Sequence, residues 1–432
     1  MIFEIFTFIF FYYVFIMSNF AKVVIFDDRN KFFHFIFVNS SRTPFSMGRV
    51  KGGGKIFLKN TDNLGAYSKK KCSFAEIKFK KMMRNRQYYI VFLLAFFVFL
   101  SAHAQKRYAM YGVGFYNLEN LFDTCHDEGK NDHEFLPSGS YRWTELKYTS
   151  KLRNMARVLA EMGTDRLPGV GCAFIGVCEV ENAKCLTDLC NQPALKDRNF
   201  QFCHIEGPDQ RGVDCALLYN PSLFSVHNVK LIPYVYELEK DARRATRGFL
   251  TVSGTLANEP VAVVVCHWPS RFAGSYYREL AGKQVRAVKD SLLQENPKCK
   301  IFVMGDMNDD PNNASMAEAL GAKPDIDKVK TGEMYNPWWN ILTKQGRGTL
   351  IYDGNWNLFD QIVMTPNLLN QKGKKDFSTL KFFQTQIFER DYLKQTEGKY
   401  KGNLKRTHAG GVWLDGYSDH LPVVTYLVKE AK

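Results

Sequence analysis

A chain of 432 residues with a formal net charge of +14 is long enough for two or three average domains and basic enough to suggest an anionic partner. The charge is concentrated near the N-terminus: residues 1–104 contain 16 Lys and Arg against 5 Asp and Glu, which leaves 42 against 39 for residues 105–432. For this near-neutral remainder, bulk charge gives only weak support for binding to nucleic acid or to an anionic membrane.

Residues 83–104 are organised like a secretory signal peptide. Two arginines precede an apolar run from Tyr88 to Leu100, and Ala102-His103-Ala104 supplies the small-residue cleavage pattern before Gln105. The apolar run is shorter than the roughly 20 residues that a membrane helix needs. We therefore expect cleavage near Gln105 and export to the periplasm or the extracellular space.

The sequence upstream of the signal peptide, residues 1–82, is rich in Phe, Ile, Lys and Asn and shows no clear helix or strand period. A second hydrophobic run, Met1 to Met17, allows an N-terminal membrane anchor. The alternative is a non-native or disordered extension, included because the start codon is placed too early. We favour the extension, because a signal peptide must lead the chain. Residues 105–432 are then expected to form one domain without a membrane span.

Nine of the ten cysteines lie after Ala104, which suits an oxidising compartment. Cys178, Cys215 and Cys266 sit in apolar runs and are expected to be buried thiols. Cys185 and Cys190 are the better candidates for a disulfide. No CxxC pair occurs, so zinc-binding and thioredoxin-like sites have no support.

From residue 105 onward, short apolar runs alternate with helical segments and with turns rich in Gly, Pro and Asn. The expected helices are Lys147 to Met162, whose apolar residues form one stripe, Gly282 to Leu293 and Ser315 to Leu320. This order predicts an α/β fold in which helices cover the outer faces of sheets. The expected strands are Met110 to Tyr116, Ala173 to Val180, Val213 to Tyr219, Phe249 to Leu256, Val261 to Cys266, Lys300 to Met304, Leu358 to Met364 and Pro422 to Val428.

Several of these apolar runs end in a carboxylate, amide or imidazole. Each ending has an ordinary alternative, since Asp306 suits a turn and Asn117 suits a backbone cap. Six endings along one chain instead predict that the side chains converge at one edge of packed sheets. The endings are Phe115-Tyr116-Asn117, Val177-Cys178-Glu179, Val265-Cys266-His267, Met304-Gly305-Asp306-Met307-Asn308, Phe359-Asp360 and Ser418-Asp419-His420.

The residue types in this set match one chemistry. Oxygen ligands suit a hard divalent cation, Mg²⁺ or Mn²⁺ with Ca²⁺ as a further option. Histidines with carboxylates to orient them transfer protons near neutral pH. A metal, carboxylates and imidazoles together indicate phosphoryl chemistry.

The same segments resemble the endonuclease/exonuclease/phosphatase superfamily, in particular its deoxyribonuclease I-like secreted bacterial members. The likeness runs in the family's order from Met110 to Val428. It implies a four-layer sandwich of two packed mixed β-sheets flanked by helices. The matching segments are FYNLENLFD (115–123), VCEVEN (177–182), RGVDCALLY (211–219), CHWPSR (266–271), GDMND (305–309), FDQIV (359–363) and SDHLPV (418–423).

The resemblance also implies roles for individual residues. Glu179 is the expected principal metal ligand, with Asn117 and Asp419 assisting at the metal or the phosphate. Asp306 and Asn308 are expected to orient the attacking water and a phosphate oxygen. The remaining catalytic roles fall to Asp360, which would hold and polarise His420, and to His267, the second histidine of the deoxyribonuclease branch.

Further positions are weaker candidates. Arg247, Arg211 and Arg271 are placed to contact substrate phosphate through charge-assisted hydrogen bonds, or else to form surface ion pairs. Asp214 is a candidate for orienting His267, and Trp268 for stacking on a base.

These features predict an exported metal-dependent phosphodiester hydrolase, most simply an endonuclease acting as a monomer on nucleic acid without a stable protein partner. A lipid or inositol phosphoesterase is the alternative enzyme, for which Tyr335 to Trp339 is the available apolar element. A binding module without catalysis is disfavoured, because no residue of the motif set is missing.

Overall fold

The computed structural model describes residues 106–236, 246–370 and 373–431, together with the backbone of four strands nearer the N-terminus. The chain divides into two compact units, Met1–Gln105 and Lys106–Lys432. The predicted signal peptide lies outside the described residues. The first unit contains an antiparallel sheet of β1 (Ala21–Asp27), β2 (Phe32–Val38), β3 (Phe45–Met47) and β4 (Leu58–Lys59), although its sequence shows no clear strand period.

One sheet of the second unit has six strands in the order β18-β21-β5-β6-β8-β7. Its only parallel pair among the described residues is β5 with β6, so the sheet is mixed. Its strands are β5 (Tyr108–Leu121), β6 (Cys172–Val180), β7 (Gln201–His204), β8 (Asp214–Tyr219), β18 (Lys381–Ile387) and β21 (Val423–Glu430).

The other sheet has seven strands in the order β13-β14-β17-β12-β11-β10-β9 and is also mixed, with β11 parallel to β12 and β13 parallel to β14. Its strands are β9 (Phe224–Ile232), β10 (Phe249–Leu256), β11 (Glu259–His267), β12 (Lys300–Asp306), β13 (Ala322–Lys323), β14 (Met334–Tyr335) and β17 (Asp360–Met364).

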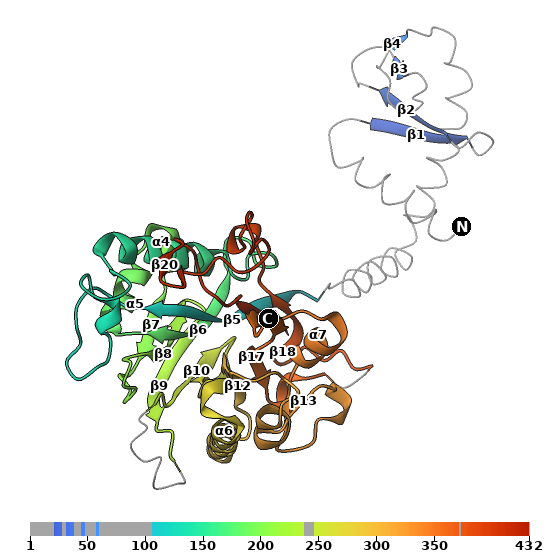
Figure 1. The fold of residues 1–432 in the computed structure, drawn as a ribbon. Coiled ribbons are helices and arrows are strands. Elements are labelled where there is room, and N and C mark those ends of the chain that lie inside the picture. The colour runs from blue at the N-terminus through green and yellow to red at the C-terminus, as the bar shows by residue number, and fades with distance from the viewer. Residues whose placement is uncertain are drawn as a thin grey trace, which may run out of the picture. The chain divides into compact units, whose positions relative to one another are not determined.

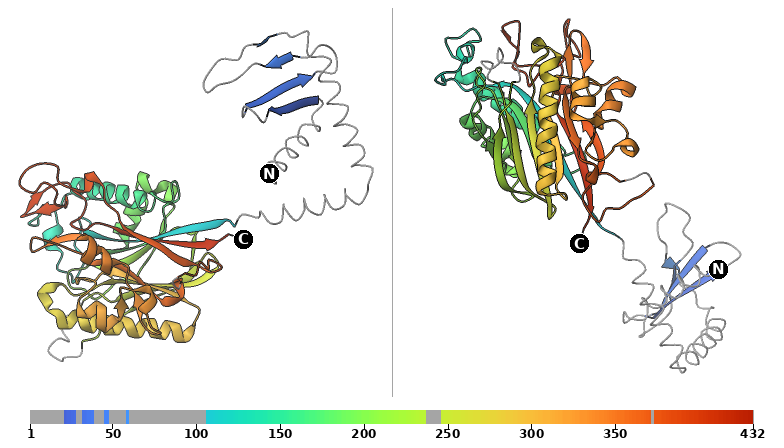
Figure 2. Two further views of the ribbon diagram at one scale, coloured as in Figure 1. Left: turned by 90° about the vertical axis from the view of Figure 1, so that its right-hand side faces the viewer. Right: turned by 90° about the horizontal axis from the view of Figure 1, so that it is seen from below.

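Helices cover the outer faces of both sheets. α4 (Glu145–Glu161) and α5 (Ala183–Cys190) lie on the six-stranded sheet, whereas α6 (Ser275–Glu295) and a turn of π-helix (Ser315–Leu320) lie on the seven-stranded one (Figures 1 and 2). α7 (Trp338–Gln345) packs beside β17. The predicted four-layer α/β sandwich is confirmed. Two small hairpins complete the unit, β15 (Leu350–Tyr352) with β16 (Asn355–Asn357), and β19 (His408–Ala409) with β20 (Val412–Trp413).

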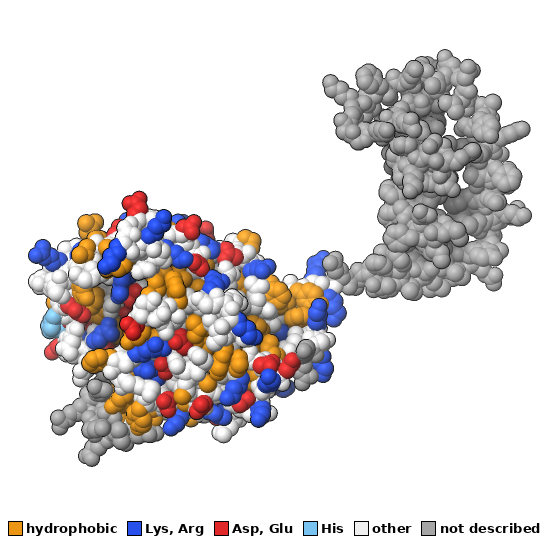
Figure 3. Space-filling model, turned by 45° about the vertical axis from the view of Figure 1, so that its right-hand side comes forward, with side chains coloured by type: hydrophobic (Ala, Val, Ile, Leu, Met, Phe, Trp, Pro, Cys, Tyr) orange, Lys and Arg blue, Asp and Glu red, His pale blue; other side chains and the backbone are white. Residues whose placement is uncertain are grey.

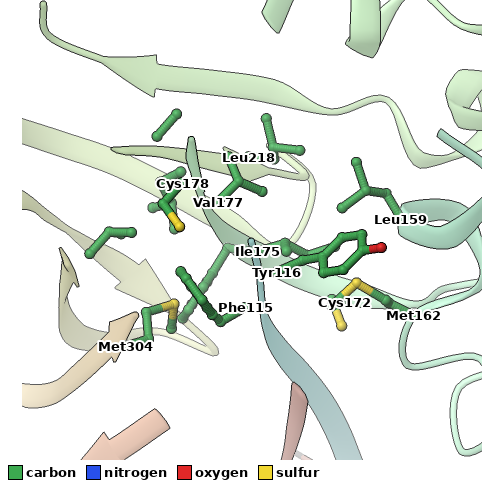
Figure 4. Close-up of a cluster of buried hydrophobic side chains, with 14 of the residues drawn as sticks. Phe115, Tyr116, Leu159, Met162, Cys172, Ile175, Val177, Cys178, Leu218 and Met304 are labelled. Carbon is green, nitrogen blue, oxygen red and sulfur yellow. The ribbon is translucent and has the colours of Figure 1, made fainter. Parts of the chain in front are cut away.

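Successive side chains of β5 point to opposite faces of the sheet, so that one strand packs against two layers. Tyr116 points to the α4 side, near Leu159 and Met162, while its neighbour Phe115 points between the two sheets toward Met304 (Figure 4). Both aromatic side chains are fully buried. The apolar residues that the sequence places on successive positions of this strand therefore hold the sheet against both a helix and the second sheet.

The cysteines differ from expectation. All nine cysteines within the described part of the chain are free thiols, including the predicted pair Cys185 and Cys190. These two lie five positions apart on α5. At 3.6 residues per turn they point about 140° apart around the helix axis, which prevents a bond between them. The buried state expected for Cys178, Cys215 and Cys266 is confirmed.

Among the described residues, no helix combines the length and apolar character that a membrane span requires.

Candidate active site

Strand register brings three predicted site residues into one row. His267 at the end of β11 is paired in register with Asp306 at the end of β12, and Asp306 is paired with Asp360 at the start of β17. All three are buried. The row arises because β11 and β12 run parallel, so that their carboxyl ends meet, whereas β17 runs the opposite way and begins there.

The six-stranded sheet contributes Asn117 and Glu179 from the neighbouring strands β5 and β6. The Asn117 amide donates to Glu179 Oε1 at 3.2 Å and to Asp306 Oδ2 at 3.1 Å. Its own carbonyl oxygen accepts from the backbone N–H of Glu119 at 2.8 Å. The fully buried amide of Asn117 therefore links the ends of both sheets, so its role is not limited to capping the local backbone.

The backbone around the site adopts the left-handed conformation at several non-glycine residues. Such residues are uncommon and tend to mark places where the surrounding structure holds a strained backbone for function. The backbone N–H of Asn120 donates to Glu179 Oε2 at 2.9 Å, which shows one use of this geometry. The residues are Glu119 (φ 48°), Asn120 (φ 52°), Glu179 (φ 61°) and Asn308 (φ 48°).

His420 is held by Asp360 from the other sheet. His420 Nδ1 lies 2.7 Å from Asp360 Oδ2, and its Nε2 lies 3.8 Å from Asp306 Oδ2. The Ser418 hydroxyl donates to the backbone oxygen of Asn117 at 2.8 Å and accepts from the His420 backbone N–H at 3.1 Å. The segment before β21 is thereby fixed to β5, and the imidazole faces the central carboxylate.

Burial and the neighbouring carboxylates shift the pKa of His420 in opposite directions. Burial disfavours the charged form of His420, but the carboxylates of Asp360 and Asp306 outweigh it and raise the His420 pKa well above its usual range. Burial, with Asp360 and Glu179 nearby, raises the pKa of Asp306 to about 7. Burial, followed by Arg247 and Arg211, lowers the pKa of His267 well below its usual range. Their surroundings therefore shift the pKa values of the two histidines in opposite directions.

The donor atoms fit a divalent cation. Ligand atoms of Glu179, His267 and Asp306 lie within 4.8 Å of one another. His267 Nε2 is 3.7 Å from both Glu179 Oε1 and Asp306 Oδ2. Among the described residues, the buried atoms His267 Nδ1 and Asp360 Oδ1 have no hydrogen-bond partner. Unpartnered buried polar atoms beside a carboxylate cluster are what a site built for an ion, water and substrate presents.

Two predicted residues lie at the rim of this set. The Asn308 amide donates to the backbone oxygen of Trp268 at 3.0 Å, and its backbone N–H donates to Asp306 Oδ1 at 2.9 Å. Asp419 is 31% exposed, and its Oδ1 lies 3.9 Å from His420 Nε2. Both are close enough to contact a substrate held at Asp306 and His420.

The three predicted phosphate-binding arginines are engaged in protein contacts. Arg247 pairs with Asp209 at 3.0 Å and donates to the Trp268 backbone oxygen at 3.2 Å. Arg211 donates to Asn120 Oδ1 at 2.6 Å. Arg271 bonds Asp310, Asn313, Asn357 and the Asn308 backbone oxygen, and its guanidinium lies 4.4 Å from the Phe359 ring. Arg271 thus braces the loop that carries Asn308.

Two weaker predictions are wrong. Asp214 does not orient His267: its carboxylate lies 3.2 Å from His204 Nε2 and accepts from the Gly207 N–H at 3.0 Å, because β7 places His204 beside it. Trp268 is fully buried against α6 and cannot stack on a base.

Sequence analysis missed a second group of charges behind the site. Arg406 Nη2 lies 2.8 Å from Asp419 Oδ2, and Arg406 Nε donates to Glu119 Oε1 at 2.8 Å. Lys151, completely buried on α4, donates to Thr407 Oγ1 and to the Tyr417 backbone oxygen at 2.5 Å each. Arg406 follows no apolar strand, so strand endings could not reveal it. Lys151 interrupts the apolar stripe of α4, and that break was the available signal.

Comparison with known proteins identifies one family and several solved structures of similar fold. A family model described as the endonuclease/exonuclease/phosphatase family matches residues 112–429. No curated protein matches the chain.

Solved structures of similar fold include three at 14% identity. An endonuclease/exonuclease/phosphatase family protein from Bacteroides thetaiotaomicron covers 76% of this chain and 97% of its own, with a TM-score of 0.47. A mannosyl-6-phosphatase from the same organism covers 73% and 99%, with a TM-score of 0.45. TDP2 from D. rerio, complexed with single strand DNA product, covers 74% and 99%, with a TM-score of 0.43.

Proposed function

The chain belongs to the endonuclease/exonuclease/phosphatase family, and from this premise we propose that it is an exported, divalent-metal-dependent phosphodiester hydrolase that cleaves nucleic acid. The observation that carries the proposal is the convergence of the strand ends. Asn117 bonds both Glu179 and Asp306, and His420 bonds Asp360 while facing Asp306. A carboxylate cluster for a metal and an oriented imidazole thus lie at one place.

Glu179 and Asp306 are the residues that would hold Mg²⁺ or Mn²⁺, with Asp419 assisting from the rim, while Asn117 presents its NH₂ group to the two carboxylates and not an oxygen to the cation. When bound, the cation neutralises charge on the phosphoryl oxygens and the leaving oxygen. Asn117 fixes the spacing of the two carboxylates through its two hydrogen bonds. The chain supplies a preformed set of oxygen donors, so little rearrangement is needed when the cation binds.

Proton transfer belongs to His420, Asp306 and Asp360 acting together. Asp360 holds His420 Nδ1, which leaves Nε2 facing Asp306 and the space where water would attack. The Asp306 carboxylate is placed to accept a proton from water, and the His420 imidazolium, with Nε2 3.8 Å from Asp306 Oδ2, is placed to donate one. Asp360 stabilises the imidazolium form, since it is fully buried beside the ring.

His267 acts on the opposite side of Asp306. Its Nε2 faces Glu179 and Asp306, so it is placed to hold a phosphoryl oxygen or to serve the leaving oxygen. A second imidazole at this position suits a diester, in which both the attacking water and a sugar oxygen exchange protons. This feature supports nucleic acid over a phosphomonoester as the substrate.

Charge sets the expected strength of binding. Residues 105–432 carry 42 basic against 39 acidic side chains, and the face in Figure 3 shows both signs interspersed rather than one basic patch. Electrostatic affinity for nucleic acid comes from neutralised phosphates. We therefore expect modest affinity and turnover without long residence on the substrate.

The lipid or inositol phosphoesterase alternative needs an apolar or polybasic loop that faces a membrane. The element available for this, Tyr335 to Trp339, does not supply it, because Tyr335 is 8% exposed and Trp338 is fully buried in the core beside β17. A non-catalytic binding module is disfavoured because the predicted metal-binding and proton-transfer residues are brought together.

The test is a substrate panel. Purified protein starting at Gln105 is incubated with plasmid DNA, RNA, bis-p-nitrophenyl phosphate and sphingomyelin, each with Mg²⁺ and with EDTA. The proposal expects hydrolysis of nucleic acid and of the small diester with Mg²⁺ alone. Turnover of sphingomyelin without cleavage of nucleic acid would replace the proposed substrate with a lipid, and equal activity in EDTA would remove the metal.

A further inference from the structure

One arginine next to the candidate site has part of its guanidinium free. Arg406 lies 2.8 Å from Asp419 through Nη2 and 2.8 Å from Glu119 through Nε. Within the described residues, no hydrogen bond or ion pair involves Nη1. The side chain is 43% exposed. Because Asp419 also lies 3.9 Å from His420 Nε2, the guanidinium and the imidazole flank the same carboxylate.

Glu119 fixes the direction of this guanidinium. The Glu119 side chain is 4% exposed, and its Oε2 accepts from the Thr407 backbone N–H at 2.7 Å while its Oε1 accepts from Arg406. Arg406 and Thr407 are therefore both held by one carboxylate that lies two residues after Asn117. The guanidinium is positioned before any ligand arrives, which lowers the entropy cost of binding through it.

Three other cations near the site do not have this freedom, whereas the Arg211 side chain donates to Asn120 Oδ1 and has no buried carboxylate that positions it among the described residues. Arg247 is committed to Asp209 and to a backbone oxygen, and Arg271 to the loop that carries Asn308. Lys151 is completely buried and bonded to Thr407 and Tyr417. Lys151 can offset the charge of Glu119 from behind, but it cannot touch a ligand in the site.

We propose that Arg406 binds a non-bridging phosphoryl oxygen of the substrate or the phosphate product, with Glu119 as the residue that positions it. The inference rests on the proposed function and names the residue that recognises the anion. Arginine suits this task because its planar fork of donors pairs with phosphate oxygens. The ligand class is a phosphoryl group, and the contact lies on the Asp419 side of the site.

The test compares Arg406→Ala with Arg347→Ala. Arg347 is a matched control, because its side chain is 45% exposed and pairs with a single carboxylate, that of Glu389, at 2.9 Å. The binding constant of inorganic phosphate is measured by calorimetry in the presence of Mg²⁺, together with its inhibition constant against bis-p-nitrophenyl phosphate. Arg406→Ala should weaken phosphate about tenfold or more, the scale of one charge-assisted hydrogen bond. Arg347→Ala should leave phosphate binding unchanged.

Two further variants separate positioning from contact. Glu119→Gln keeps an acceptor for Thr407 but loses the charge that faces Arg406, so it should weaken phosphate in the same direction by a smaller factor. Arg406→Lys keeps the charge without the fork and should fall between the wild type and Arg406→Ala. Added guanidinium ion should restore part of the phosphate affinity of Arg406→Ala and none in Arg406→Lys.

Several results would overturn the inference. Phosphate affinity that is unchanged in Arg406→Ala removes the contact, as does a wild type that binds no phosphate. A change confined to the Mg²⁺ requirement, equal to that of Asp419→Asn, would mean that Arg406 only holds Asp419. If the wild type binds phosphate through Arg406 but hydrolyses no diester, the proposed function fails while this inference stands.

Discussion

At the residue scale, His420 and Asp360 form the pair on which the proposed proton transfer depends most. The alternative role of His420 is a packed histidine at the start of β21, whose loss would simply weaken the fold. The 2.7 Å contact to a fully buried carboxylate from the other sheet and the orientation toward Asp306 instead indicate proton transfer. The two roles differ in what a substitution changes.

We expect His420→Ala to reduce turnover about a hundredfold or more, the usual scale for positioned proton transfer, with a small change in melting temperature. Asp360→Asn should lose activity similarly. The double variant should be little worse than either single variant, because residues that act as a unit are strongly non-additive. Kinetics on bis-p-nitrophenyl phosphate give the comparison, and multiplied losses would show that the two residues act independently.

Residue-level prediction from sequence succeeded where chemistry follows strand ends. His267, Asp306 and Asp360 each end or begin an apolar run, and register alone aligns them. It failed for Asp214, since nothing in the sequence indicates that β7 would place His204 beside it. It missed Arg406 because this residue lies on a loop whose course depends on the tertiary contact with Glu119.

At the scale of elements, the hairpin β19–β20 shows how a histidine without a catalytic role is used. His408 looks like a loop residue in the sequence, because Gly410 and Gly411 follow it. The structure buries it among aromatic rings, with ring centroids 4.7 Å from Tyr141 and 5.1 Å from Trp413. Burial, followed by Lys147, Lys151 and Arg406, lowers the His408 pKa to about 4.

This shift predicts a pH dependence of stability. The folded pKa of His408 lies below the unfolded value of about 6.5, so the unfolded chain binds the proton first as the pH falls. The contribution of His408 to stability is therefore present above pH 6.5 and lost toward pH 4. As the pH is lowered over this range, the unfolding free energy of the wild type should therefore fall by on the order of 1 kcal/mol more than that of His408→Phe. Urea unfolding from pH 7 to 4.5 measures it, and parallel curves for both proteins would contradict it.

The elements with strong patterns were predicted well, whereas the strands β7, β9 and β18 and the helix α7 were not predicted. The expected helix from Lys147 to Met162 is α4, and the expected strand from Phe249 to Leu256 is β10. The short pieces β13, β14, β15 and β16 were not predicted, since two or three residues carry no period. Their positions follow from pairing with strands distant in sequence.

At the scale of the whole molecule, export remains a prediction from sequence. If residues 83–104 are a signal peptide, the mature protein from the native host should begin near Gln105. N-terminal sequencing of protein isolated from the cell envelope or the medium gives the answer. A mature chain that retained residues before Met83 would contradict both the cleavage site and the interpretation of residues 1–82 as an extension.

The whole-molecule architecture also explains why the site forms only in the folded domain. Asn117 and Glu179 come from one sheet, and His267, Asp306 and Asp360 come from the other. The sequence predicted both the sandwich and the convergence of these ends. It could not give the distances, because the packing of the sheets is set by contacts such as Phe115 against Met304 (Figure 4).

The central claim, metal-dependent phosphodiester hydrolysis at the joined sheet ends, is tested most directly by Mg²⁺ titration of bis-p-nitrophenyl phosphate hydrolysis in wild type and Glu179→Gln. Glu179 accepts hydrogen bonds from Asn117 and Asn120, which glutamine can retain in part while it loses the charge. We predict Mg²⁺-dependent turnover in the wild type and, in Glu179→Gln, at least tenfold weaker Mg²⁺ activation together with lower maximal activity. Identical Mg²⁺ titration curves for the two proteins, or wild-type hydrolysis that is indifferent to Mg²⁺ and EDTA, would contradict the account.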